Sequence, residues 1–125
     1  MAAKSEIGIW GETLAAEYLK KKRYRIVCRN FRVRSGEIDI IAENRDYLVF
    51  AEVKTRKNEK YGEPREFVGN SKQNRIRTAA ALWLAAHPTD KQPRFDVIEI
   101  YAPQGTLTEA PQITLLENAF DGGGF

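Results

Sequence analysis

The stretch GEIDIIAENRDYLVFAEVKTR, at residues 36–56, determines the predicted fold. Two runs rich in Ile, Val, Leu and Phe are separated by a short polar turn, which predicts a β-hairpin of two largely buried strands. Charged side chains interrupt both runs, because Asp39 lies in the first and Glu52 and Lys54 lie in the second. Burying an ionised group is unfavourable unless it is paired. These three residues therefore require an explanation other than folding.

The rest of the chain supplies helices and further strands around this hairpin. The first helix has Ser5 as its N-cap, and the second is capped by Ser71 and ended by Pro88. The predicted elements are a helix at 5–23, strands at 24–33, 37–43 and 47–55, a loop at 57–70, a helix from Ser71 to Pro88, and strands at 94–102 and 112–117. We expect one domain at residues 1–120 and a flexible tail at 121–125.

The order α-β-β-β-α-β-β predicts an α/β (α+β) domain with a mixed β-sheet flanked by helices. Helices should cover both faces of the hairpin, because both of its faces are apolar. One face is expected to carry Ile38, Ile40, Val49, Ala51 and Val53, and the other Ile41, Leu48 and Phe50.

The length of the hairpin turn decides which charged residues meet. A two-residue turn at Arg45-Asp46 places Asp39 directly opposite Glu52, and Glu37 opposite Lys54. Lys54 also shares a face with Glu52, because side chains two positions apart on a strand point the same way. A three-residue turn would instead put the two carboxylates on opposite faces.

Opposed carboxylates in a buried sheet repel each other and lose solvation. A divalent metal ion would neutralise both, and oxygen ligands suit such hard cations. The alternative is a charged strand end exposed at the margin of the sheet. Phe50 and Leu48 argue against that alternative, because they place the face of Glu52 in a core.

Composition excludes several other classes of protein. Cys28 is the only cysteine and His87 the only histidine, so no disulfide framework, Cys/His zinc cluster or Cys-His catalytic pair is expected. No apolar run approaches the length of a membrane-spanning helix, and the first residues do not resemble a secretory signal. We therefore expect a cytoplasmic protein.

The net charge is +3, and it is unevenly distributed. Residues 54–77 contain eight Lys and Arg against three Glu, whereas residues 95–125 contain five acidic and no basic residues. This asymmetry favours an anionic partner on one side of the molecule. An ordinary solvated basic face remains the alternative.

Asp39 followed by Glu52-Val53-Lys54 resembles the catalytic motif of the PD-(D/E)xK nucleases, which have the restriction-endonuclease-like fold. More closely, the chain resembles the YraN family of predicted endonucleases, which are related in fold to archaeal Holliday-junction resolvases. The matching words between Gly8 and Ile98 are G-x-x-G-E, N-F-R, G-E-I-D-I-I-A, V-F-A-E-V-K-T-R, Y-G-E-P and R-F-D-V-I. The chain departs from the family pattern at two places. Ile38 precedes Asp39 where the motif name has a proline, and residues 73–77 lack the tyrosine of a Gln-x-x-x-Tyr motif found in some relatives.

The resemblance implies a metal-dependent endonuclease that hydrolyses phosphodiester bonds in DNA, including branched or processed DNA. Asp39 and Glu52 would hold Mg²⁺ or Mn²⁺ together with the Val53 carbonyl, and Glu12 on the preceding helix would complete the site. Lys54 would orient the attacking water or stabilise developing charge. For Glu12, a solvated helix glutamate is the alternative.

The same resemblance, with the basic segment, predicts sequence-independent contacts to nucleic-acid phosphates. The candidate residues are Arg32, Arg34, Arg56, Lys57, Lys60, Lys72, Arg75 and Arg77. Tyr61 would stack on a base, or simply pack on its own domain. Two other functions stay open: a non-catalytic nucleic-acid-binding protein and an adaptor with a basic interaction face. The sequence also leaves open whether the chain forms a homodimer.

Overall fold

The structure is a computed structural model that describes residues 4–58 and 69–121. The expectations for Lys60, Tyr61, most of the predicted loop and residues 122–125 of the predicted tail lie outside these ranges. No helix among the described residues is long and apolar enough to cross a membrane.

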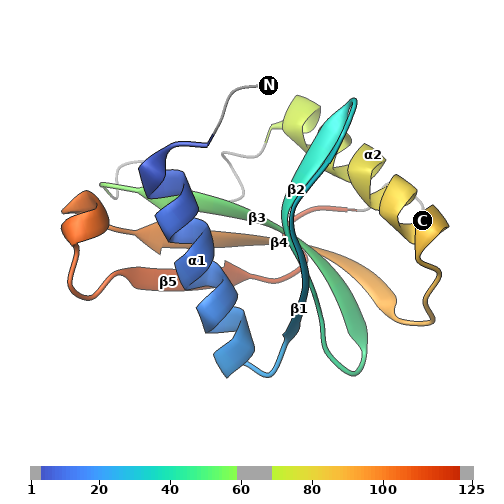
Figure 1. The fold of residues 1–125 in the computed structure, drawn as a ribbon, viewed down its shortest axis with the longest axis horizontal. Coiled ribbons are helices and arrows are strands. Elements are labelled where there is room, and N and C mark those ends of the chain that lie inside the picture. Colours follow the sequence, from blue (N-terminus) through green and yellow to red (C-terminus); the bar gives the residue numbers. More distant parts are fainter. Residues whose placement is uncertain (1–3, 59–68, 122–125) are drawn as a thin grey trace.

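The predicted order of helices and strands is confirmed (Figure 1). The elements are α1 (Glu6–Lys21), β1 (Arg25–Val33), β2 (Gly36–Glu43), β3 (Tyr47–Arg56), α2 (Asn70–Ala86), β4 (Gln92–Tyr101), a short 3-10 helix η2 (Gly105–Leu107) and β5 (Gln112–Leu116). The strands form one sheet in the order β1-β2-β3-β4-β5. The sheet is mixed, as predicted, because β3 and β4 are parallel and the other neighbours are antiparallel. Helix α2 makes the crossover that a parallel pair requires.

The start of the first helix was predicted correctly, and the start of the second was not. The Gly8 amide donates to Ser5 Oγ at 3.1 Å, so Ser5 is the N-cap of α1. Helix α2 begins one residue before Ser71, and its N-cap is Gly69, which makes no side-chain cap bond. Ser71 therefore lies inside the first helical turn, and its predicted role as a cap is wrong.

Each face of the sheet packs against one helix, which confirms the predicted burial on both sides. The core under α1 includes Ala15, Leu19, Ile40, Val49, Ile98 and Ile100. The core under α2 includes Ile41, Phe50, Ile76, Ala79, Ala80, Phe95 and Val97.

One assignment of a face is wrong. Ile38 was expected beside Ile40, but it packs with Ile41 under α2. Strict alternation along β2 is therefore interrupted between Ile38 and Ile40, which is the position of Asp39.

Two glycines let the helices approach the hairpin closely. A Cβ atom on Gly11 would lie 2.1 Å from Thr55 Oγ1, and one on Gly36 would lie 2.0 Å from the Arg75 carbonyl oxygen. Helix α1 thus lies directly on the end of β3, and α2 lies directly on the start of β2. Both helices reach the part of the hairpin that carries the charged residues.

Gly36→Ala should lower the free energy of unfolding by roughly 1–3 kcal/mol, because the methyl group forces α2 away from β2. Urea denaturation of both proteins measures the difference. Gly69→Ala is the control for replacing a glycine without a clash, since a Cβ atom there meets nothing within 4 Å; its loss should be smaller, limited to the poorer N-cap of α2. Equal losses in the two variants would show that close packing at Gly36 is no constraint.

Candidate functional site

The hairpin turn has the predicted length, but the ladder ends earlier than predicted. The Asn44 amide donates to the Tyr47 carbonyl at 3.1 Å, which closes a two-residue turn. Paired residues run from the turn to Ile40 and Ala51, in the predicted register, and stop there. Neither Asp39–Glu52 nor Glu37–Lys54 forms a β-pair, so the predicted direct oppositions are wrong.

Beyond the end of the ladder, the Asp39 side chain replaces a backbone hydrogen bond. The Val53 amide donates to Asp39 Oδ2 at 2.8 Å. On the other side of β2, Asn30 of β1 lies between the pairs Arg29–Ile40 and Phe31–Ile38 and has a φ of 55°. Asparagine tolerates this left-handed conformation better than most residues do. The sheet is thus locally irregular on both sides of Asp39.

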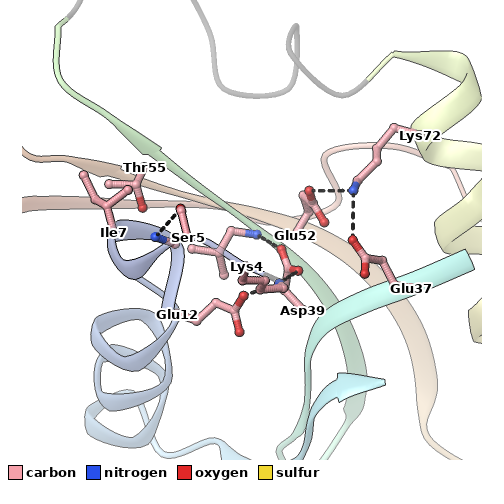
Figure 2. A pocket seen from close by; sticks show the side chains of 11 residues that line it. Lys4, Ser5, Ile7, Glu12, Glu37, Asp39, Glu52, Thr55 and Lys72 are labelled. Atoms are coloured by element: carbon pink, nitrogen blue, oxygen red, sulfur yellow. Dashed lines mark hydrogen bonds and ion pairs between the residues drawn. The ribbon is translucent and has the colours of Figure 1, made fainter. Parts of the chain in front are cut away.

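A cavity of about 260 Å³ lies at this irregularity (Figure 2). Residues from the start of α1, from β2, from β3 and from the first turn of α2 line it. The lining residues are Lys4, Ser5, Ile7, Gly8, Glu12, Glu37, Asp39, Glu52, Val53, Thr55 and Lys72. The three predicted acidic site residues, Glu12, Asp39 and Glu52, are therefore brought together. All three are buried, with exposed fractions of 2, 4 and 3%.

Lys4 bridges the first two of these acids. Its ammonium group forms ion pairs with Glu12 Oε2 and Asp39 Oδ1. Burial acts to lower the pKa of Lys4, but the hydrogen bonds and negative charges of Asp39 and Glu12 outweigh it and raise the pKa above its ordinary value. The lysine therefore stays charged. Glu12 is a buried, paired residue, so the alternative of a solvated helix glutamate is wrong.

Two other lysines neutralise Glu52. Both Lys54 Nζ and Lys72 Nζ lie 3.4 Å from Glu52 Oε1, and Lys72 also lies 3.6 Å from Glu37 Oε1. Lys54 thus shares a face with Glu52, as predicted, although it contacts the cavity only through that carboxylate. Burial first, and then repulsion by Asp39, raise the pKa of Glu52 to about 7, against the opposing charges of Lys72 and Lys54.

The donor atoms match a divalent cation in chemical type. Among the described residues, Glu12 Oε1 and Glu52 Oε2 are buried and have no hydrogen-bond partner, although Arg29 Nη2 lies 3.9 Å from the former. Unpartnered buried carboxylate oxygens are unfavourable, and they are the ligands that Mg²⁺ prefers. No group of three Asp, Glu, His or Cys in the described ranges is spaced as a formed metal site. The carboxylate oxygens are therefore of the chemical type that binds a metal ion, and the Lys4 ammonium group lies between Glu12 and Asp39.

Sequence reasoning missed Lys4, placed Glu37 opposite Lys54 rather than beside Lys72, and gave Lys72 another role. Lys4 precedes α1, so no helical periodicity connects it with Glu12. Lys72 was predicted to contact phosphates, yet it bridges Glu37 and Glu52 in the cavity. The sequence signal for the position of Lys72 was Gly36, because a glycine in a strand often marks the close approach of another backbone. In the structure that backbone is α2, whose first turn lies beside β2.

The predicted phosphate-binding residues fall into two groups. Arg34, Lys57 and Arg75 are exposed, and Arg56 is half-buried. Arg32 instead pairs with Glu37 at 3.3 Å. Arg77 donates to the Asp121 carbonyl at 2.7 Å and to Gln73 Oε1 at 3.0 Å, so its guanidinium group holds the C-terminal segment against α2.

The fold and this cavity define a mixed α/β domain with a buried acidic pocket at an interrupted strand pair. The sequence profile described as "Uncharacterised protein family UPF0102" matches residues 11–100. A UPF0102 protein of Symbiobacterium thermophilum is 47% identical over 116 residues, which cover 91% of this chain and 95% of the relative. A second, from Geobacter sulfurreducens, is 47% identical over 116 residues, covering 92% and 88%. The chain belongs to the UPF0102 family, and the resemblance to YraN-type proteins is confirmed at that level.

The raised pKa of Glu52 predicts a specific pH dependence of stability in metal-free buffer. Its pKa is about 7 when folded, against an ordinary value of 4.5. The stabilisation that comes from the protonated Glu52 side chain is fully present below pH 4.5. It is lost as the pH rises through 7, because the folded protein must then ionise a buried carboxyl group. The free energy of unfolding of the wild type should therefore fall by roughly 2–3 kcal/mol between about pH 5 and 8, and this fall should be absent in Glu52→Gln.

Thermal or urea unfolding at several pH values, in EDTA, measures this difference. The matched control is Glu17→Gln, at an exposed position of α1, which should follow the wild-type profile. Parallel profiles for the wild type and Glu52→Gln would contradict the assignment.

Proposed function

We propose that this protein is a divalent-metal-dependent endonuclease of the PD-(D/E)xK type, which hydrolyses phosphodiester bonds in DNA. The observation that supports this most strongly is the convergence of Glu12, Asp39 and Glu52 from three different elements on one buried pocket. Metal-dependent phosphodiester hydrolysis needs carboxylates that hold the metal ion and a cation that stabilises developing negative charge. The motif resemblance at Asp39 and Glu52-Val53-Lys54 agrees with this proposal.

In the proposed site, Asp39 and Glu52 hold the ion and Glu12 completes its surroundings. The hydrogen bond from the Val53 amide holds Asp39 Oδ2 in place. This bond leaves Asp39 Oδ1 directed toward the cavity. A bound divalent ion would lower the pKa of a water molecule and stabilise negative charge on the phosphate. Its charge would also favour the ionised form of Glu52, whose pKa burial otherwise raises.

Lys54 supplies a positive charge next to the ligand Glu52. When a phosphodiester lies at the pocket, the ammonium group can donate a hydrogen bond to a phosphoryl oxygen or to the attacking water. Such a contact stabilises charge that develops in the transition state, so it accelerates the reaction more than it strengthens binding.

The chemistry of the pocket fits a nucleic-acid backbone better than a base. The residues that line it are acidic, basic, small or aliphatic, and the described lining contains no aromatic side chain for stacking. The exposed cations Arg34, Lys57 and Arg75 would contact phosphates, which give affinity without sequence preference. We therefore propose a DNA substrate recognised through its backbone, and the family resemblance favours branched or processed DNA.

One observation favours a second candidate, a non-catalytic nucleic-acid-binding protein. Lys4, Lys54 and Lys72 each form ion pairs with the acids of the pocket. A domain that had lost catalysis could keep these ion pairs as structural elements. Metal binding and turnover separate the two candidates.

Asp39→Asn and Glu52→Ala should each lose site-specific Mn²⁺ binding and DNA cleavage together, because each removes a metal ligand. Metal-free DNA binding should persist or become tighter, since a charge that repels phosphate is gone. Calorimetric titration with Mn²⁺, and cleavage of linear, flap and four-way DNA, measure these effects. A wild-type protein that binds no Mn²⁺ even with DNA present would exclude the nuclease.

Lys54→Ala should still bind Mn²⁺ but slow cleavage by roughly a hundredfold or more, the expected result for an interaction made mainly in the transition state. Single-turnover kinetics at saturating protein separate the chemical step from binding. Lys21→Ala, at the exposed end of α1, controls for the loss of one positive charge. An unchanged chemical rate in Lys54→Ala would remove this residue from the proposed mechanism.

The double variant Arg34→Ala, Arg75→Ala should weaken binding to all DNA sequences equally. The slope of log affinity against log salt should flatten by roughly 0.9 for each phosphate of duplex DNA that the variant no longer neutralises. Fluorescence anisotropy at several salt concentrations measures both quantities. A weakening restricted to one sequence would show that these arginines read bases.

A further inference from the structure

The position of Lys4 suggests a role that the motif resemblance does not contain. Figure 2 shows its side chain extending from the segment before α1 into the cavity, with its nitrogen directed at Asp39 and Glu12. Its side chain is only 19% exposed. Lys4 thus acts as a cation that the chain itself places between two buried carboxylates.

The same two carboxylates belong to the proposed metal site, so one position serves two cations. An ammonium group and a divalent ion both seek the same anionic oxygens, and they repel each other at short distance. Glu12 and Asp39 carry two negative charges, of which Lys4 neutralises one. A divalent ion would neutralise both, but it must displace the ammonium group first.

The local structure allows Lys4 to leave without unfolding the helix. Lys4 lies outside α1, and the cap bond from the Gly8 amide to Ser5 Oγ holds the helix start independently of it. Lys4 also borders a second hollow of about 330 Å³, which is lined by Ile9, Asn30 and Arg32 as well. The released side chain therefore has open space next to the cavity.

We propose that Lys4 is a tethered counter-ion that competes with the divalent cation for Glu12 and Asp39, and so sets the affinity of the pocket for that cation. This inference rests on the proposed metal site, but it concerns the chain's own residue and does not require turnover. Lys4 neutralises one of the two negative charges of these acids until a metal ion binds, and its release accompanies metal binding.

The experiment compares Mn²⁺ binding by the wild type, Lys4→Gln and the control Lys21→Gln, by calorimetry without DNA. If Lys4 occupies the pocket in roughly nine of ten wild-type molecules, its removal should tighten Mn²⁺ binding about tenfold. Lys21→Gln loses the same charge at an exposed site and should bind like the wild type. Lys4→Arg keeps a competing cation and should not show the increase.

A measurement on the wild-type sequence covers the case in which Lys4→Gln does not fold. Lysines labelled with ¹³C-methyl groups keep their charge and are followed by NMR during a Mg²⁺ titration. The Lys4 signal should move toward the position of exposed lysines, while that of Lys21 stays unchanged. A Lys4 signal that stays in place while Mg²⁺ binds would overturn the competition.

The outcomes distinguish this inference from the proposed function. Tighter binding by Lys4→Gln, or Mn²⁺ binding by that variant alone, supports the competition. Equal affinities for Lys4→Gln and the wild type overturn the inference and leave the nuclease standing. Absence of Mn²⁺ binding in every variant without DNA overturns this inference, and its absence with DNA present overturns the proposed function as well.

Discussion

The hydrogen bond from the Val53 amide to the Asp39 carboxylate is the interaction on which the site depends. The β2–β3 ladder ends at Ile40 and Ala51, and beyond that point this side chain satisfies the Val53 amide. A buried amide without a partner would be costly, so the carboxylate is held in place by the sheet itself. The same bond determines where the strands stop pairing, and therefore where a cavity forms.

Interrupting the ladder makes the cavity accessible to residues from both helices. Helices α1 and α2 pack on opposite faces of the sheet. Even so, Glu12 of α1 and Lys72 of α2 line the same cavity as Asp39 and Glu52. A continuous strand pair would separate these two faces completely. Gly11 and Gly36 contribute by letting each helix lie against the hairpin at this end.

The sequence predicted the regular parts of this arrangement and missed the irregular ones. Alternating apolar runs and a two-residue turn at Arg45-Asp46 predicted the register that is found near the turn, although the sequence left a three-residue turn open. Charges within buried strands were enough to single out Asp39 and Glu52. Ile38 was assigned to the wrong face because alternation assumes a regular strand, and Asn30 and Asp39 interrupt that regularity. Lys4 was missed because it precedes the helix, where no periodic pattern relates sequence to direction.

Electrostatics links the two proposed ligands, metal and DNA, through the same few side chains. An acidic pocket repels phosphate, whereas the lysines on Glu52 and Asp39 attract it. A bound divalent ion would replace lysine as the partner of the carboxylates and free ammonium groups for the phosphates nearby. Each ligand would then favour the other, and the coupling must be reciprocal: whatever factor the metal adds to DNA affinity, DNA adds to metal affinity. The density of opposite charges in this pocket is therefore consistent with a site that is neutralised internally when empty and completed by its substrate.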